Sequence, residues 1–90
     1  MPTKLGQHLK QLRESAEVSQ KVVAEKFGYE SPQFVSNWER GTSKPPVTAI
    51  KKLASIYKTN AEDLFEVVLE SHLEKIRTQL YREFSASKAV

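Results

Sequence analysis

The sequence predicts an all-α fold of five helices, the last of which extends well beyond the domain formed by the others. Three observations lead to this prediction. Apolar residues recur at intervals of three and four along most of the chain, which is the spacing of amphipathic helices. Residues with helix-capping side chains precede these segments, and glycine or proline separates several of them. No segment shows the alternating pattern of a convincing β-strand.

The composition limits the classes of function. Ninety residues are enough for one small domain with an appendage, and the lack of cysteine excludes disulfides and thiolate metal sites. The net charge of +3 is uneven, because residues 1–60 carry +5 and residues 61–90 carry −2. The basic part favours a polyanionic partner. Apolar runs are too short to span a membrane, and we expect a cytoplasmic protein.

The first helix is expected from Lys4 to Ser15, with Thr3 as its N-cap. Its apolar residues are spaced four, three and four apart: Leu5, Leu9, Leu12 and Ala16. The second helix is expected to begin after Ser19, whose hydroxyl can cap a helix, and to end at Gly28, which favours the left-handed conformation. Its apolar face contains Val22, Val23, Ala24 and Phe27.

The third helix follows a tight turn. Ser31 is expected to be its N-cap, with Pro32 at the first helical position, where a missing amide hydrogen costs nothing. Val35 and Trp38, three residues apart, are expected to face the core. The outward positions are then Gln33, Ser36, Asn37 and Arg40. A short helix that presents amides and an arginine suits the major groove of DNA.

A glycine and two prolines break the chain between residues 41 and 46. A fourth helix is expected to open at Thr48, near Val47, with an inward face made of Ile50, Leu53, Ala54 and Tyr57. Asn60 is expected to cap the fifth helix, which runs without Gly or Pro from Ala61 to Phe84, a length of roughly 36 Å.

The fifth helix is expected to divide into two parts. Leu64 and Phe65 complete the compact domain, so that residues 1–65 form the domain and residues 66–90 form a dimerisation helix and tail. The second part carries an apolar stripe at steps of four, three and four: Leu69, Leu73, Ile76 and Leu80. Such a stripe requires a partner. The tail from Ser85 to Val90 is small and polar, and we expect it to be disordered.

The strings SQKVVAEKFG, SPQFVSNWERG and PPVTAIKKLASIYKTNAEDLF closely resemble the lambda-repressor and Cro-type (XRE-family) helix-turn-helix regulators. The resemblance covers about Leu5 to Phe65. The residues that match at the expected spacing are Ser19, Gln20, Ala24, Gly28, Ser36, Glu39, Arg40 and Gly41. The resemblance implies a five-helix domain that binds operator DNA as a dimer, with the third helix in the major groove.

Roles for individual residues follow from the resemblance. It implies base contacts for Pro32, Gln33, Ser36 and Asn37, and phosphate contacts for Gln20, Arg40, Thr42, Ser43 and Lys44. It also implies a structural pair between Arg13 and Glu39. The chain departs from the family pattern in a turn that is one residue longer than usual, and in Glu17, which replaces a common glycine. If the backbone at Glu17 is left-handed, the strain is roughly 1 kcal/mol.

The sequence therefore predicts a homodimeric, sequence-specific transcription factor, most simply a repressor, that binds double-stranded DNA. A rival interpretation is an adaptor or antitoxin that uses the C-terminal helix to hold a partner protein. An enzyme is a third class. The sequence shows no nucleophile beside a base, no metal-ligand spacing and no cofactor loop, so we expect no catalysis, no metal and no cofactor.

Overall fold

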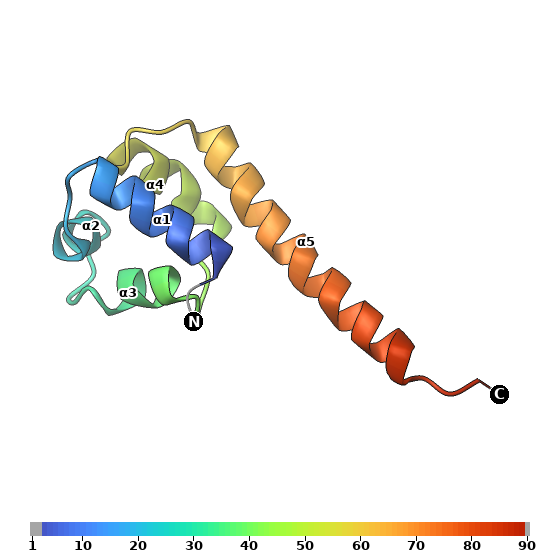
Figure 1. Cartoon of the computed structure of the whole chain (residues 1–90). Helices are drawn as coiled ribbons and strands as arrows, with labels where there is room; N and C mark the ends of the chain where they lie inside the picture. The colour runs from blue at the N-terminus through green and yellow to red at the C-terminus, as the bar shows by residue number, and fades with distance from the viewer. Residues whose placement is uncertain (1–2, 90) are drawn as a thin grey trace.

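The computed structural model describes residues 3–89. Its elements, in chain order, are α1 (Lys4–Ser15), α2 (Gln20–Lys26), α3 (Gln33–Arg40), the 3-10 turn η1 (Val47–Ala49), α4 (Ile50–Ile56) and α5 (Ala61–Ala86). Among the described residues there are five α-helices and no strand, which confirms the all-α prediction. The helices α1 to α4 form a compact group, and α5 projects from it to give an elongated molecule of 55 × 25 × 21 Å (Figure 1).

Three helices begin where the capping residues predict. Thr3, Ser19 and Asn60 each have extended backbone angles, and each side-chain oxygen accepts a hydrogen bond from the amide three residues later. The donor–acceptor distances are 2.9, 3.1 and 3.0 Å. Each cap satisfies an amide that lacks a partner within its helix, which fixes the starting points of α1, α2 and α5.

The start of α3 differs from the prediction. Its N-cap is Pro32, with φ −76° and ψ 7°, and the first helical residue is Gln33. Ser31 lies one residue too early to cap α3, and its hydroxyl accepts from the Gln33 amide across two residues at 3.3 Å. The residue before a proline is biased away from helical angles, so the Ser31 side chain closes a local turn. The prediction that Ser31 is the N-cap was wrong.

The start of the fourth helix also differs. Residues 47–49 form the 3-10 turn η1, and α4 begins only at Ile50, so Thr48 does not open an α-helix. The chain leaves α4 through Lys58 in a left-handed conformation with φ 56°, which the sequence did not reveal. Glu17 is left-handed as well, with φ 58°, which is the backbone conformation on which the expected strain between α1 and α2 depends.

The core lies where α1 meets α3 and where α4 meets the first turns of α5. Its buried residues are Leu5, Leu9, Val23, Ala24, Val35, Trp38, Ile50, Leu53, Ala54, Tyr57, Leu64 and Val68. Helices α1 and α3 approach closely at Gly6, because a Cβ at that position would overlap the backbone oxygen of Glu39. A glycine is therefore needed for the two helices to pack at this distance.

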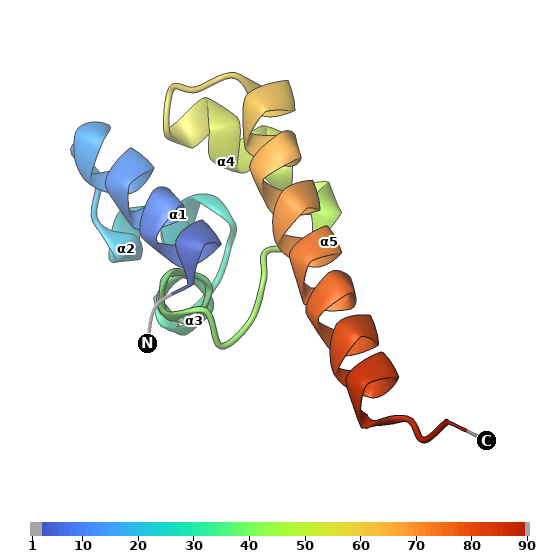
Figure 2. The ribbon, with the colours of Figure 1, turned by 45° about the vertical axis from the view of Figure 1, so that its right-hand side comes forward.

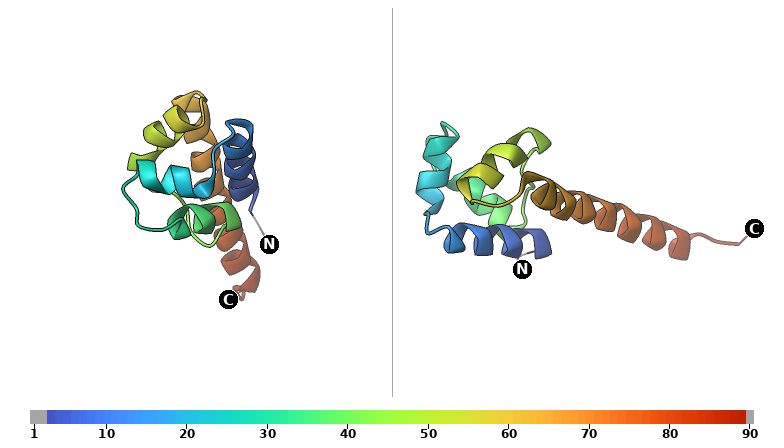
Figure 3. Two further views of the ribbon diagram at one scale, coloured as in Figure 1. Left: turned by 90° about the vertical axis from the view of Figure 1, so that its left-hand side faces the viewer. Right: turned by 90° about the horizontal axis from the view of Figure 1, so that it is seen from above.

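Helix α5 is packed only over its first turns. Leu64 and Val68 are each 1% exposed, whereas Phe65 is 39% exposed. The prediction that Phe65 closes the core was wrong, and the expected boundary at residue 65 falls within the packed part of α5. Past the packed turns, α5 extends freely (Figures 2 and 3).

The end of α5 lies later than the sequence indicated. Ser85 and Ala86 continue the helix instead of belonging to a disordered tail, and residues 87–89 follow without regular structure. Val90, the last residue of the expected tail, lies outside the described residues.

Candidate nucleic-acid interface

Helices α2 and α3 form a compact helix-turn-helix unit. Val23 and Val35 are fully buried between them, and the small Ala24 is 1% exposed. The longer turn is closed by the Tyr29 amide, which donates to the Ala24 carbonyl at 2.9 Å. The Tyr29 ring stacks on Phe27 at a centroid distance of 5.4 Å. The stacked Tyr29 ring therefore packs the turn that is one residue longer than usual in the family.

The inner side of α3 is fixed to α1 by an ion pair. Arg13 donates from Nε to Glu39 Oε2 at 2.7 Å and from Nη2 to Oε1 at 3.1 Å. The two side chains are only 13% and 4% exposed. The hydrogen bond to Glu39 raises the pKa of Arg13, so the guanidinium stays charged. The structure brings these residues together as expected and fixes how α3 is presented.

Gln20 has a structural partner that the sequence did not indicate. Its Nε2 donates to Glu39 Oε1 at 3.0 Å, which joins the first residue of α2 to the ion pair of α1 and α3. Arg13 also donates to the Val18 carbonyl at 3.0 Å. One amide hydrogen of Gln20 is thus bound within the protein. The phosphate contact of Gln20 stays a prediction.

The outer side of α3 presents a row of hydrogen-bonding side chains. Asn37 Oδ1 accepts from Gln33 Nε2 at 2.9 Å and from Arg40 Nη2 at 2.7 Å. These residues lie away from the buried Val35 and Trp38. We name this set, together with the half-exposed Ser36 and with Pro32 at the helix start, the α3 face: Pro32, Gln33, Ser36, Asn37 and Arg40. Its internal hydrogen bonds align the amides before any ligand binds.

The loop after α3 is held by one carbonyl group. Gly41 is left-handed, with φ 82°, and turns the chain away from the helix. The Asn37 carbonyl then accepts from the amide and hydroxyl of Thr42, at 3.0 and 3.2 Å, and from the amide of Ser43 at 3.4 Å. The predicted phosphate-binding residues of this loop are therefore positioned next to the α3 face.

Lys44 occupies a half-buried position in the same loop. Burial lowers the pKa of Lys44, and the positive charge of Lys75 on α5 lowers it further. Lys75 thus acts on Lys44 although the two residues are far apart in the sequence. Lys75 was not among the predicted site residues, because only the folded chain brings α5 to this loop.

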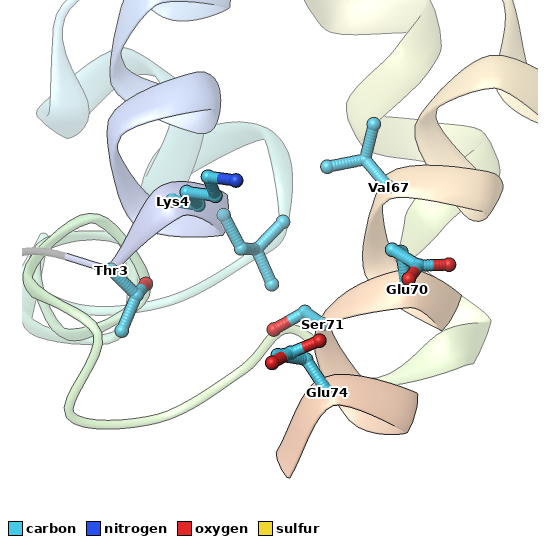
Figure 4. A pocket seen from close by; sticks show the side chains of 7 residues that line it. Thr3, Lys4, Val67, Glu70, Ser71 and Glu74 are labelled. Atoms are coloured by element: carbon cyan, nitrogen blue, oxygen red, sulfur yellow. The ribbon is translucent and has the colours of Figure 1, made fainter. Parts of the chain in front are cut away.

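An open groove of about 680 Å³ lies between the start of α1 and α5, and no residue of the α3 face lines it. Thr3 and Lys4 lie on one side of it, and the α5 residues Val67, Glu70, Ser71 and Glu74 lie on the other (Figure 4). Within residues 3–89, no cluster of three His, Cys, Asp or Glu side chains is arranged to hold a metal ion. Over the same range, no helix combines the length and apolar composition of a membrane span.

Comparison with known families agrees with this geometry. The model of the helix-turn-helix family matches residues 9–64, which include α2 and α3 and make up more than half of the chain. Searches of curated proteins and of solved structures gave no match. The matched domain is a DNA-binding domain of a family typically without catalytic activity. The chain belongs to the Cro and lambda-repressor type of the helix-turn-helix family.

Proposed function

We propose that this protein is a transcriptional repressor that recognises a specific operator as a homodimer. The observation that carries the proposal is the α3 face, where two carboxamides and a guanidinium are aligned on one side of a helix. The NH2 group of a carboxamide can donate to adenine N7 while its oxygen accepts from the adenine N6 amino group, and arginine suits phosphate or guanine. The buried pair behind the helix supports rigid presentation of these groups.

Recognition requires an exchange of hydrogen bonds. In the free protein, Asn37 Oδ1 accepts from both Gln33 and Arg40. In the complex, Gln33 and Asn37 turn toward base edges, and Arg40 moves to a phosphate, so that hydrogen bonds within the protein are replaced by hydrogen bonds to DNA. Pro32 and Ser36 provide the remaining base contacts. Gln20, Thr42, Ser43 and Lys44 provide the remaining phosphate contacts, which position the helix.

The dimer is proposed from the stripe of α5, defined as Leu69, Leu73, Ile76 and Leu80. These side chains are 36%, 42%, 53% and 58% exposed, so exposure increases away from the domain. At about 100° per residue, the stripe lies nearly opposite the α5 residues that line the groove facing α1. The domain therefore does not cover it. Burying a leucine is worth about 1.5–3 kcal/mol, which favours association with a second copy.

Selection of bound fragments from a random DNA pool tests the proposal. The full chain should enrich an inverted repeat whose half-sites are about 34 Å apart, the spacing of successive major grooves. Placed between a promoter and a reporter gene, that sequence should lower transcription when the protein is present. A variant in which both Gln33 and Asn37 are alanine serves as the matched control and should enrich no common sequence. Enrichment of a single half-site would contradict the homodimer.

A second candidate function rests on the same stripe. An adaptor or antitoxin would cover these residues with a different protein instead of a second copy. Sedimentation distinguishes the two, because a short coiled coil should associate at tens of micromolar or below, roughly the range of a 7 kcal/mol interaction. A chain that remains monomeric at this concentration would favour the adaptor.

A further inference from the structure

The outer side of α3 also carries a large apolar side chain. Phe34 is 56% exposed, although it belongs to the helix that presents the hydrogen-bonding residues. Around the helix axis it lies about 60° from Asn37 and about 40° from the buried Trp38. Its ring therefore borders the α3 face and adds an apolar surface beside the carboxamides.

Neighbouring rings fix the position of Phe34. Its ring meets that of Tyr29 at a centroid distance of 5.0 Å and an interplanar angle of 42°. Tyr29 in turn packs on Phe27 at 5.4 Å and against Trp38 at 6.3 Å. A continuous series of aromatic contacts thus runs from the core to Phe34. Aromatic pairs at these distances attract each other, so the Phe34 ring is braced although it is exposed.

The major groove contains one apolar group that such a ring can recognise. The polar groups at the base edges are hydrogen-bond donors and acceptors, whereas thymine presents its 5-methyl group, which phenylalanine can contact. We propose that Phe34 determines specificity by packing against a thymine methyl group next to the bases read by Gln33 and Asn37. This inference rests on the proposed function, because it requires α3 to lie in the major groove.

Deoxyuridine provides a direct test, since it lacks only the 5-methyl group of thymidine. The probe is a duplex selected from a random pool by the full chain, with deoxyuridine placed at each thymine of one half-site in turn. For the unmodified protein, one position should show a loss of affinity of about fourfold, which corresponds to burial of one carbon group. In Phe34→Ala, the thymine and deoxyuridine duplexes should bind equally at that position.

Two variants separate methyl recognition from other effects. Phe34→Leu keeps an apolar side chain and should retain a preference for thymine. Gln33→Ala removes a neighbouring carboxamide and should bind more weakly while keeping the full ratio between thymine and deoxyuridine. Helical content measured by circular dichroism checks folding, which a substitution at a 56% exposed position should leave unchanged.

Three outcomes would overturn the inference. Equal affinity for deoxyuridine at every position would mean that no methyl group is read. A ratio that persists in Phe34→Ala would assign methyl recognition to another residue. Selection that enriches no sequence at all would remove the proposed function together with the inference. A Phe34 that docks on a protein instead of DNA would give the first or second outcome.

Discussion

The same ion pair chemistry occurs in two regions of this molecule with opposite consequences. Arg13 and Glu39 meet at 2.7 Å in the domain, where their side chains are 13% and 4% exposed. Glu74 and Arg77 meet at 2.6 Å on α5, where they are 63% and 52% exposed. The first pair connects two helices, and its Glu39 also accepts a hydrogen bond from Gln20. The second pair lies within one turn of a single helix. Burial and connectivity, not distance, decide what each pair does.

This contrast extends to the two regions as a whole. The domain formed by α1 to α4 and the start of α5 is a self-sufficient packing unit whose polar groups position α3. Within the described residues, no buried side-chain nitrogen or oxygen lacks a hydrogen-bond partner. The second half of α5 has its apolar side chains in solvent. The domain buries its own apolar core, whereas the free half of α5 leaves an apolar stripe that, in our proposal, a second copy covers.

Replacement of the glutamate in each ion pair by alanine should give the largest difference in stability between the two regions. Glu39→Ala should lower the free energy of unfolding by about 3–5 kcal/mol, because it leaves Arg13, whose side chain is only 13% exposed, without its partner. Glu74→Ala should change it by less than about 0.5 kcal/mol, since exposed pairs contribute little. Urea denaturation followed by circular dichroism measures both. Similar losses for the two variants would show that the pair between α1 and α3 is not effectively buried.

The stripe of α5 provides the next test of the comparison. Leu73→Ser should weaken self-association by about 1.5–3 kcal/mol, the value of one buried leucine, without destabilising the domain. Tyr81→Ser is a matched control, because Tyr81 is 68% exposed and lies off the stripe. Sedimentation equilibrium gives the dissociation constant of each variant. If both substitutions have the same effect, the interface does not follow the stripe.

A truncated chain tests the same region, provided that it keeps the buried residue Val68. A chain that ends at Glu66 would lose this core residue, so the cut belongs after His72. The shortened protein should remain folded, sediment as a monomer and bind operator DNA more weakly, since the two half-sites are no longer linked. Unfolding of this chain would mean that the domain depends on the free half of α5.

The sequence predicted the features that depend on neighbouring residues. Thr3, Ser19 and Asn60 cap helices through bonds that span three residues, and such local signals can be read from the chain. The resemblance implied a phosphate contact for Gln20, which stays a prediction. Its hydrogen bond to Glu39 was not foreseen, because only the fold brings these distant residues within 3.0 Å of each other. Long-range pairs of this kind leave no periodic signal.

Burial at the boundary of α5 was misjudged for a related reason. Phe65 and Val68 are three positions apart and both apolar, so either suits an inward position in the pattern. The packing of α5 against α4 and α1 decides that Val68 is buried and Phe65 is not. Phe34 escaped notice similarly, because its role depends on the position of Tyr29, in the preceding turn.

The α3 face should show effects on DNA binding instead of folding. Gln33→Ala and Asn37→Ala should each weaken binding to the selected operator by about 1–3 kcal/mol, and leave binding to a scrambled duplex nearly unchanged. Stability should stay the same, because both side chains bond only to other residues of the α3 face. Equal losses on the two duplexes would reassign these residues to phosphate contacts.

The smallest expected effects belong to the cations around α3. Arg40→Gln and Lys44→Gln should weaken binding to all DNA sequences, and each should reduce the slope of log affinity against log salt by about 0.9, the value for one phosphate. The two cations differ in setting. Arg40 is exposed on the helix, whereas Lys44 is half-buried, and its pKa is lowered by burial and by Lys75.

A phosphate beside Lys44 would offset the repulsion between Lys44 and Lys75 and favour the charged form of Lys44. Lys75→Gln, on α5, should therefore raise the pKa of Lys44 in the free protein, which NMR titration of the lysine side chain can follow. If Lys75 also touches the backbone of DNA, the same variant will reduce the salt slope by a further 0.9 or so. An unchanged slope would confine DNA binding to the domain and leave the free half of α5 to association alone.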